Sequence, residues 1–88
     1  MPVMTEADIT AVIARHLEKT LEQPAESAIN AETRLVEDLA LDSLQSFEMV
    51  AVLEDHYQLT LSIEVLHDVR TVGDVARAVA AALARQAR

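Results

Sequence analysis

The sequence predicts an all-α fold, a small four-helix bundle with three main helices and a short third helix. Apolar residues recur at spacings of three and four rather than in alternation, which is the helical period. The chain has one Gly and two Pro, which leaves little room for β-turns. With only one Phe and one Tyr, the core must be built from Leu, Val, Ile and Ala. The 88 residues are enough for one domain, residues 1–88, and too few for two.

The first helix is expected over about residues 5–21. Thr5 followed three residues later by Asp8 is a helix-start signal. Apolar residues then recur along one face, at Ile9, Val12, Ile13, Leu17 and Leu21. This face is predicted to enter the core.

Residues 22–41 break the helical pattern and are predicted to form a long loop between the first two helices. Apolar residues appear there at irregular intervals, at Ile29, Leu35, Val36 and Leu39. A structureless loop of this length is uncommon in a compact domain unless it is functional or packed by its own side chains. The scattered apolar residues therefore predict a loop pinned to the core.

The second helix is expected over about residues 43–57. Asp42 with Gln45 three residues later fits a capping box, in which each side chain accepts a hydrogen bond from the other residue's backbone. This assignment puts Ser43 at the first helical position, where its hydroxyl is not needed for capping and can point into solvent. The competing interpretation is that Ser43 is a plain helix-start residue, because Asp-Ser before an apolar run is ordinary in soluble proteins.

Apolar residues are nearly continuous along this second helix, so some of them must face outward. A helix that is apolar on most sides is either deeply buried or keeps an exposed patch for a partner, and so small a bundle cannot bury every side. We expect Val50, Leu53 and Tyr57 to face inward. The accessible side chains are expected to be Leu44, part of Phe47 and Ala51, between the acids Glu48, Glu54 and Asp55.

Two further helices are expected in the last third of the chain. A short one, over about residues 62–67, starts at Ser62 and turns Ile63 and Leu66 inward. The other, over about residues 72–86, follows the start signal Thr71-Val72-Gly73-Asp74. One face of it is apolar and comprises Val72, Val75, Ala76, Val79, Ala82 and Leu83.

The negative charge is concentrated in one part of the chain. The formal net charge is −8, and no Lys or Arg occurs among the acids Glu37, Asp38, Asp42, Glu48, Glu54, Asp55, Glu64 and Asp68. A field of one sign repels nucleic acid and anionic membranes and speeds encounter with basic protein surfaces. The competing interpretation is that solvated helices are often acidic merely for solubility.

Several kinds of chemistry are excluded by residues that the chain lacks. Without cysteine it has no disulfide, thiolate metal site or thiol nucleophile, so thiol chemistry must come with a cofactor. Ser43 lacks the flanking glycines of a nucleophile elbow, and no metal site is proposed. The sequence shows neither a basic, apolar leader nor a stretch approaching the roughly 18 apolar residues of a membrane span. A cytoplasmic protein without enzymatic activity is expected.

Three motifs follow one another in the loop and the second helix, namely Val36-Glu37-Asp38-Leu39, Asp42-Ser43-Leu44 and Glu48-Met49-Val50-Ala51-Val52-Leu53-Glu54. Asp-Ser-Leu alone is weakly specific, but the order of helices, loop and motifs over residues 5 to about 84 resembles the acyl carrier protein family, including peptidyl and aryl carrier domains. One departure is Ala40, where many members have glycine. Alanine is disfavoured at positive φ, so the turn into Ser43 is expected to differ in detail.

In that family the serine of the motif carries a 4′-phosphopantetheine arm, so the resemblance implies Ser43 as the attachment site, with its neighbours Asp42 and Leu44 as further cofactor-binding residues. A phosphopantetheinyl transferase would move the arm from coenzyme A, and its thiol would hold acyl or aminoacyl intermediates as thioesters. The resemblance implies a free-standing, monomeric carrier in fatty acid, polyketide or nonribosomal peptide biosynthesis. The other partners would be a loading ligase and downstream synthase or transferase enzymes with basic surfaces that contact Phe47, Glu48, Ala51, Glu54 and Asp55. The alternative is an unmodified acidic helical interaction module.

Overall fold

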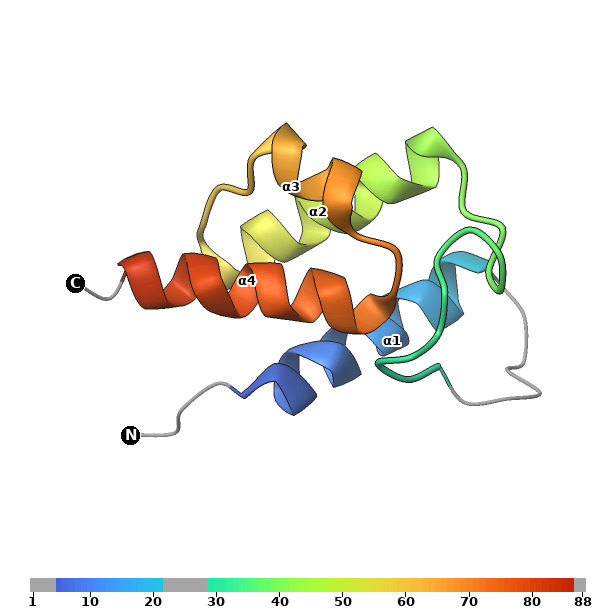
Figure 1. Ribbon diagram of the computed structural model, residues 1–88, viewed down its shortest axis with the longest axis horizontal. Coiled ribbons are helices and arrows are strands. Elements are labelled where there is room, and N and C mark those ends of the chain that lie inside the picture. Colours follow the sequence, from blue (N-terminus) through green and yellow to red (C-terminus); the bar gives the residue numbers. More distant parts are fainter. Residues whose placement is uncertain (1–4, 22–28, 87–88) are drawn as a thin grey trace.

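The computed structural model describes residues 5–21 and 29–86, and these residues form helices without a strand (Figure 1). The helices are α1 (Glu6–Leu21), α2 (Ser43–Tyr57), α3 (Ile63–Asp68) and α4 (Val72–Gln86). The predicted all-α class is confirmed. The four-helix bundle with a long loop stays a prediction, because α3 has only 6 residues and residues 22–28 of that loop lie outside the described part. The inward direction expected of Ile63 and Leu66 likewise concerns side chains outside it.

Reciprocal caps fix the starts of α1 and α4. At α1, Thr5 N donates to Asp8 Oδ2 and Asp8 N donates to Thr5 Oγ1, both at 3.1 Å. At α4, Thr71 and Asp74 make the same pair of bonds, also at 3.1 Å. Each pair satisfies backbone N–H groups that have no partner inside the helix. Both predicted start signals are confirmed.

Most of the core lies between α1 and α4, with α2 packed on α1 and the short α3 on α4. The inward side chains of α1 are Ile9, Ile13 and Leu17, each fully buried. Those of α4 are Val72, Val75, Ala76, Val79 and Ala82. These are the faces that the apolar spacing predicts, and burying them is the main favourable contribution to folding.

The loop before α2 is held to the core over the part that the structure describes. Leu35 and Leu41 are buried, and Ile29 and Leu39 pack against the core from its edge. Val36 is the exception, with 64% of its surface exposed, because neighbouring residues of a turn cannot all face the same side. The prediction of a pinned loop holds for residues 29–41 apart from Val36.

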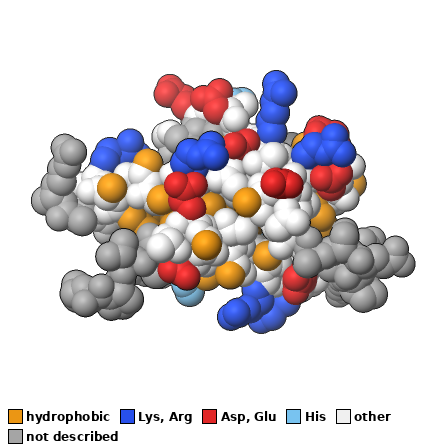
Figure 2. Space-filling model, turned by 60° about the horizontal axis from the view of Figure 1, so that its bottom comes forward, with side chains coloured by type: hydrophobic (Ala, Val, Ile, Leu, Met, Phe, Trp, Pro, Cys, Tyr) orange, Lys and Arg blue, Asp and Glu red, His pale blue; other side chains and the backbone are white. Residues whose placement is uncertain are grey.

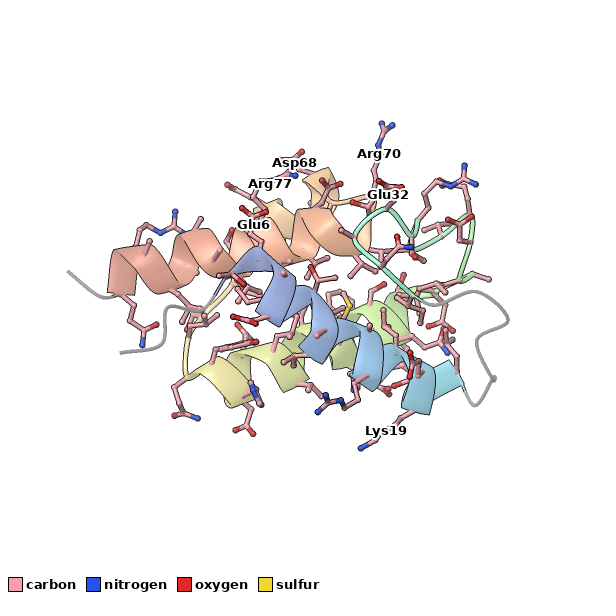
Figure 3. The ribbon with its side chains drawn as sticks, turned by 90° about the horizontal axis from the view of Figure 1, so that it is seen from below. Glu6, Lys19, Glu32, Asp68, Arg70 and Arg77 are labelled. Atoms are coloured by element: carbon pink, nitrogen blue, oxygen red, sulfur yellow. The ribbon has the colours of Figure 1, made fainter. Side chains whose placement is uncertain are left out.

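Charges of both signs are mixed on the side where α1 and α4 lie together (Figure 2). Arg77 of α4 lies between two carboxylates, with Nε at 3.7 Å from Glu6 Oε1 and Nη1 at 3.3 Å from Asp74 Oδ1 (Figure 3). These pairs are largely exposed and contribute little to stability. Among the described helices, none is long and apolar enough to cross a membrane.

Candidate cofactor attachment site

The start of α2 is fixed by the side chain of Asp42, as the sequence predicts. Asp42 has an extended backbone, with φ −92° and ψ 178°, and its Oδ1 accepts from Gln45 N at 2.8 Å. In return Gln45 Oε1 accepts from Asp42 N at 3.2 Å. The predicted capping box is therefore confirmed, and α2 begins at Ser43.

Ser43 is exposed at the first position of α2. Its hydroxyl makes no hydrogen bond to any residue that the structure describes, because Asp42 already caps the helix. The backbone N–H groups at this end of a helix have no intrahelical partner and favour a negative group. The position therefore offers a free hydroxyl beside a local environment suited to a phosphate.

The chain turns into this helix through a left-handed residue. Ala40 has φ 53°, where an alanine is strained and a glycine is not. Two backbone hydrogen bonds close the turn, from Ala40 N to Val36 O at 2.9 Å and from Leu41 N to Leu35 O at 3.1 Å. Ala40 thus takes the left-handed conformation in which alanine is disfavoured. That the turn differs in detail from the turn of glycine-containing family members stays a prediction.

The outward side of α2 carries apolar and acidic side chains together. Leu44 is 67% exposed and Phe47 56% exposed, and Ala51 is exposed one turn further along. Glu48 and Asp55 are exposed on the same side of the helix. We call Leu44, Phe47, Glu48, Ala51 and Asp55 the outer face of α2. Counted from Leu44, the other four follow at three, four, seven and eleven positions, which puts all five on one stripe of the helix.

The opposite side of α2 enters the core. Met49, Val50 and Leu53 are buried, which confirms the expectation for Val50 and Leu53. Tyr57 is half-buried, and its ring meets His56 edge to face with centroids 4.7 Å apart. The Tyr57 hydroxyl is buried without a partner in the described residues, and this burial, then the charge of Asp8, raises its pKa.

Glu54 differs from the other acids expected to meet partners. It is half-buried, and its Oε2 accepts a hydrogen bond from Leu61 N at 2.8 Å, which ties the end of α2 to the segment before α3. A shallow open hollow adjoins it, lined by Ala51, Glu54, Asp55, Gln58, Leu59 and Thr60. Glu54 therefore has a structural role besides the contact with a partner that the sequence predicts.

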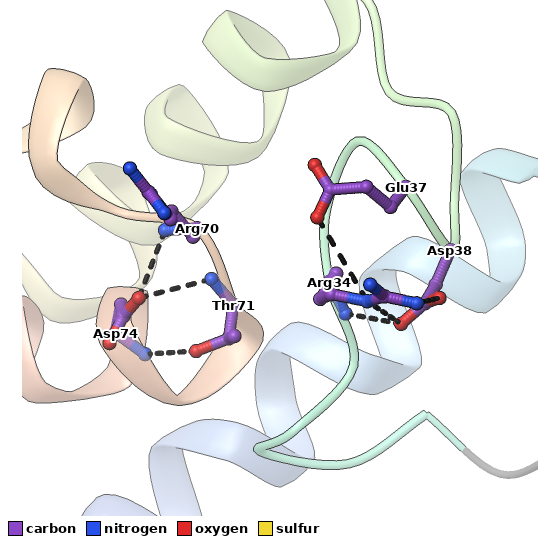
Figure 4. A network of polar contacts seen from close by, with 6 residues as sticks. All are labelled: Arg34, Glu37, Asp38, Arg70, Thr71 and Asp74. Carbon is purple, nitrogen blue, oxygen red and sulfur yellow. Dashed lines mark hydrogen bonds and ion pairs between the residues drawn. The ribbon is translucent and has the colours of Figure 1, made fainter.

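The acidic run, residues 37–68, contains no Lys or Arg, but Arg34 folds against it and offsets part of its negative charge. Arg34 contacts two of its acids, with Nη2 at 2.9 Å from Asp38 Oδ1 and Nε at 3.9 Å from Glu37 Oε2 (Figure 4). The hydrogen bonds from Arg34 hold the pKa of the Asp38 carboxyl below its usual range. Within the described ranges, no three His, Asp or Glu residues are arranged to hold a metal ion.

Sequence reasoning missed three features of this region. Arg34 lies just outside the acidic run, so its pairing with that run was not visible in the count of charges. Val52 is 38% exposed, although it lies within the apolar stretch of α2. The third is a close contact between Gly73 and the loop, for which the presence of a glycine inside a helix start was the available signal.

Comparison with known proteins identifies the family. Residues 9–79 match the family described as the phosphopantetheine attachment site. An acyl carrier protein of an Exiguobacterium species is 38% identical over 68 residues, which cover 77% of this chain and 80% of that relative. A meromycolate extension acyl carrier protein of Mycobacterium tuberculosis is 42% identical over 76 residues, 85% of this chain. The match spans 64% of that longer relative.

Solved structures agree. A chain named as an acyl carrier protein from Mycobacterium tuberculosis has 32% identity and a TM-score of 0.73, over 83% of this chain and 96% of that one. The holo acyl carrier protein of Geobacter metallireducens has a TM-score of 0.74 over 90% of each chain, and at 24% identity it shows the likeness of fold. This chain belongs to the acyl carrier protein family, whose cofactor is 4′-phosphopantetheine and whose members carry that group rather than catalyse a reaction themselves.

Proposed function

We propose that Ser43 bears the 4′-phosphopantetheine arm and that the chain holds acyl intermediates on it as thioesters. The observation that supports this most strongly is the exposed Ser43 hydroxyl, which has no hydrogen-bond partner among the described residues because Asp42 performs the capping. The names of the relatives favour an acyl cargo over an aminoacyl one. Ser46, on the next turn, is half-buried and less accessible to a transferase.

The start of α2 has one feature that favours a phosphodiester on Ser43 and one that opposes it. The unpartnered backbone N–H groups at the start of α2 offset part of its negative charge. The Asp42 carboxylate opposes that charge, but its Oδ1 already accepts from Gln45 N. When bound, the arm supplies the reactive thiol that this cysteine-free chain lacks. The protein supplies the position of the arm and the surface beside it.

The outer face of α2 is the surface that we propose for partner enzymes. Its exposed apolar side chains offer a small contact area, and its acids attract a basic partner over a distance. Such a surface fits a carrier that must bind several enzymes in turn and leave each one. The phosphopantetheinyl transferase is expected to be the first of these partners, followed by a loading enzyme and by synthases or transferases.

Intact mass spectrometry tests the proposal. Incubation with coenzyme A and a broad-specificity phosphopantetheinyl transferase should add one phosphopantetheinyl group. Ser43→Ala should abolish the addition, whereas Ser46→Ala, the matched control one turn away, should be modified like the wild type. An unmodified wild type, under conditions that modify a known carrier, would favour the unmodified interaction module instead.

We further propose that the protein acts as a monomer in the cytoplasm, in fatty acid, polyketide or nonribosomal peptide biosynthesis. The acidic surface near Ser43 supports a soluble carrier that meets basic enzymes. Mass analysis of protein taken from its native host, with the thioester preserved, would identify the cargo and through it the pathway.

A further inference from the structure

The loop that leads to Ser43 is fastened to the start of α4. Residues 31–35 run antiparallel to residues 70–73, and we call this pair of segments the clasp. Three backbone hydrogen bonds join it, from Gly73 N to Ala31 O at 2.8 Å, from Val72 N to Thr33 O at 3.0 Å and from Leu35 N to Arg70 O at 2.8 Å. The loop is thus attached to a helix that lies far from it in sequence.

Gly73 is required by the closeness of this contact. A Cβ atom at residue 73 would lie 2.8 Å from the Ala31 carbonyl oxygen and 3.1 Å from Ala31 Cβ. Because a backbone atom stands in the way, a side chain there must push residue 31 aside. Within a helix, alanine is otherwise favoured over glycine by about 1 kcal/mol. The one glycine of the chain therefore stands where helix propensity argues against it.

The clasp continues directly into the turn before Ser43. Leu35 N donates across the clasp to Arg70 O, and the Leu35 carbonyl accepts a hydrogen bond from Leu41 N at 3.1 Å. Both side chains are buried, and Leu41 precedes the capping residue Asp42. The bonds from Arg34 to Asp38 close the same turn from outside. A displacement of the clasp would be passed on to the residue that caps α2.

The other half of the clasp is held by Asp74. Its Oδ2 accepts from Arg70 N at 2.9 Å and from Thr71 N at 3.1 Å (Figure 4). These bonds fix the backbone at residues 70 and 71, where the Arg70 carbonyl accepts the hydrogen bond from Leu35 N. Asp74 thus supports the clasp as well as capping α4.

We propose that Gly73 is a positioning residue for Ser43: by allowing the clasp to close, it places the Ser43 hydroxyl for the transferase. This inference rests on the proposed attachment at Ser43. It predicts that loosening the clasp slows modification although no residue of the α2 outer face has changed.

Two matched pairs of variants separate this role from simple destabilisation. Gly73→Ala is compared with Ala81→Gly, a substitution at an exposed site of α4 that lowers stability by about 1 kcal/mol through helix propensity and leaves the clasp untouched. Asp74→Ala is compared with Asp8→Ala, because both remove one half of a capping box and only Asp74 holds the clasp. For each variant, transferase kcat and KM, urea stability and amide exchange of Leu35 and Leu41 are measured.

The clasp variants should lose about tenfold in kcat/KM with the transferase while still folded, since a misplacement of about 1 Å can cost about 100-fold. Amide exchange at Leu35 and Leu41 should rise in them and stay at the wild-type level in Ala81→Gly and Asp8→Ala. Clasp variants that are modified as fast as their controls would overturn the inference, even with faster exchange. If Gly73→Ala fails to fold, the Asp74→Ala pair decides. A wild type that is never modified would instead refute attachment at Ser43.

Discussion

Helices α2 and α4 have 15 residues each and both begin at a capping box, yet they use their apolar residues differently. The apolar residues of α4 form one stripe that is buried against α1. Those of α2 lie on two sides, one in the core and one exposed at Leu44 and Phe47. A helix that packs only against the core has its apolar residues on one stripe. Apolar residues on two sides, as in α2, indicate that the exposed side is available for contact with a partner.

The largest expected effect is the difference in stability between truncating a buried side chain and an exposed side chain of α2. Leu53→Ala removes a side chain that is 1% exposed and should lower the free energy of unfolding by about 2–5 kcal/mol. Leu44→Ala removes the same atoms from a side chain that is 67% exposed and should change it by about 0.5 kcal/mol or less. Urea denaturation measures both. Equal losses would mean that the two sides of α2 are not distinct.

The turns into the two helices provide the next test. The turn into α2 contains Ala40 at φ 53°, a conformation that glycine adopts without strain. Ala40→Gly should therefore raise the free energy of unfolding, by about 1 kcal/mol after the greater freedom of glycine in the unfolded chain is subtracted. Gly73→Ala, in the first turn of α4, should lower the free energy of unfolding because of the contact with Ala31. Denaturation curves in which both substitutions have the same sign would contradict the geometry described here.

Charge reversal on the outer face of α2 is expected to act on association. Glu48→Lys with Asp55→Lys should slow the transferase about threefold to tenfold at low salt, mainly through the rate of encounter. The control is Glu18→Lys, which changes the charge by the same amount per residue at an exposed position of α1. It should have a smaller effect. Raising the salt concentration should shrink the difference. An effect that does not depend on salt would show that the acids do not act by long-range attraction.

The smallest effect concerns the cap of α4 in acid. Hydrogen bonds from the backbone of Arg70, then of Thr71, hold the pKa of Asp74 below its usual 3.8. A lowered pKa in the folded state means that this carboxylate stabilises the fold above about pH 4 and loses that contribution as the pH falls below. Asp74→Asn should therefore be less stable at pH 7, by at most about 1 kcal/mol, and lose less on acidification. Urea titrations at several pH values check this, and parallel pH profiles for the two proteins would contradict it.

Local patterns predict much of this fold. The three capping pairs and the buried faces of α1 and α4 depend on residues three or four positions apart, so their geometry is present in the sequence itself. The same holds for Ser43, whose place follows from the cap that Asp42 and Gln45 form. The resemblance to a family, rather than any local pattern, identified that serine as more than a helix start.

What the sequence did not predict depends on contacts between distant segments. The clasp joins residue 31 to residue 73, and neither segment contains a sequence pattern that identifies the other as its partner. Glu54 was expected to meet partners, but its bond to Leu61 arises only once the chain bends back after α2. The exposure of Val52 likewise depends on which side of α2 its neighbours leave uncovered. Such features require the packed structure.

Attachment at Ser43 is tested most directly by finding where the group resides after complete reaction with coenzyme A and the transferase. Proteolysis followed by fragment mass spectrometry assigns the added group to one residue. We predict a single phosphopantetheinyl group on Ser43 and none on Ser46 or Ser62. A group found on another side chain, or no group in a reaction that converts a known carrier fully, would contradict it.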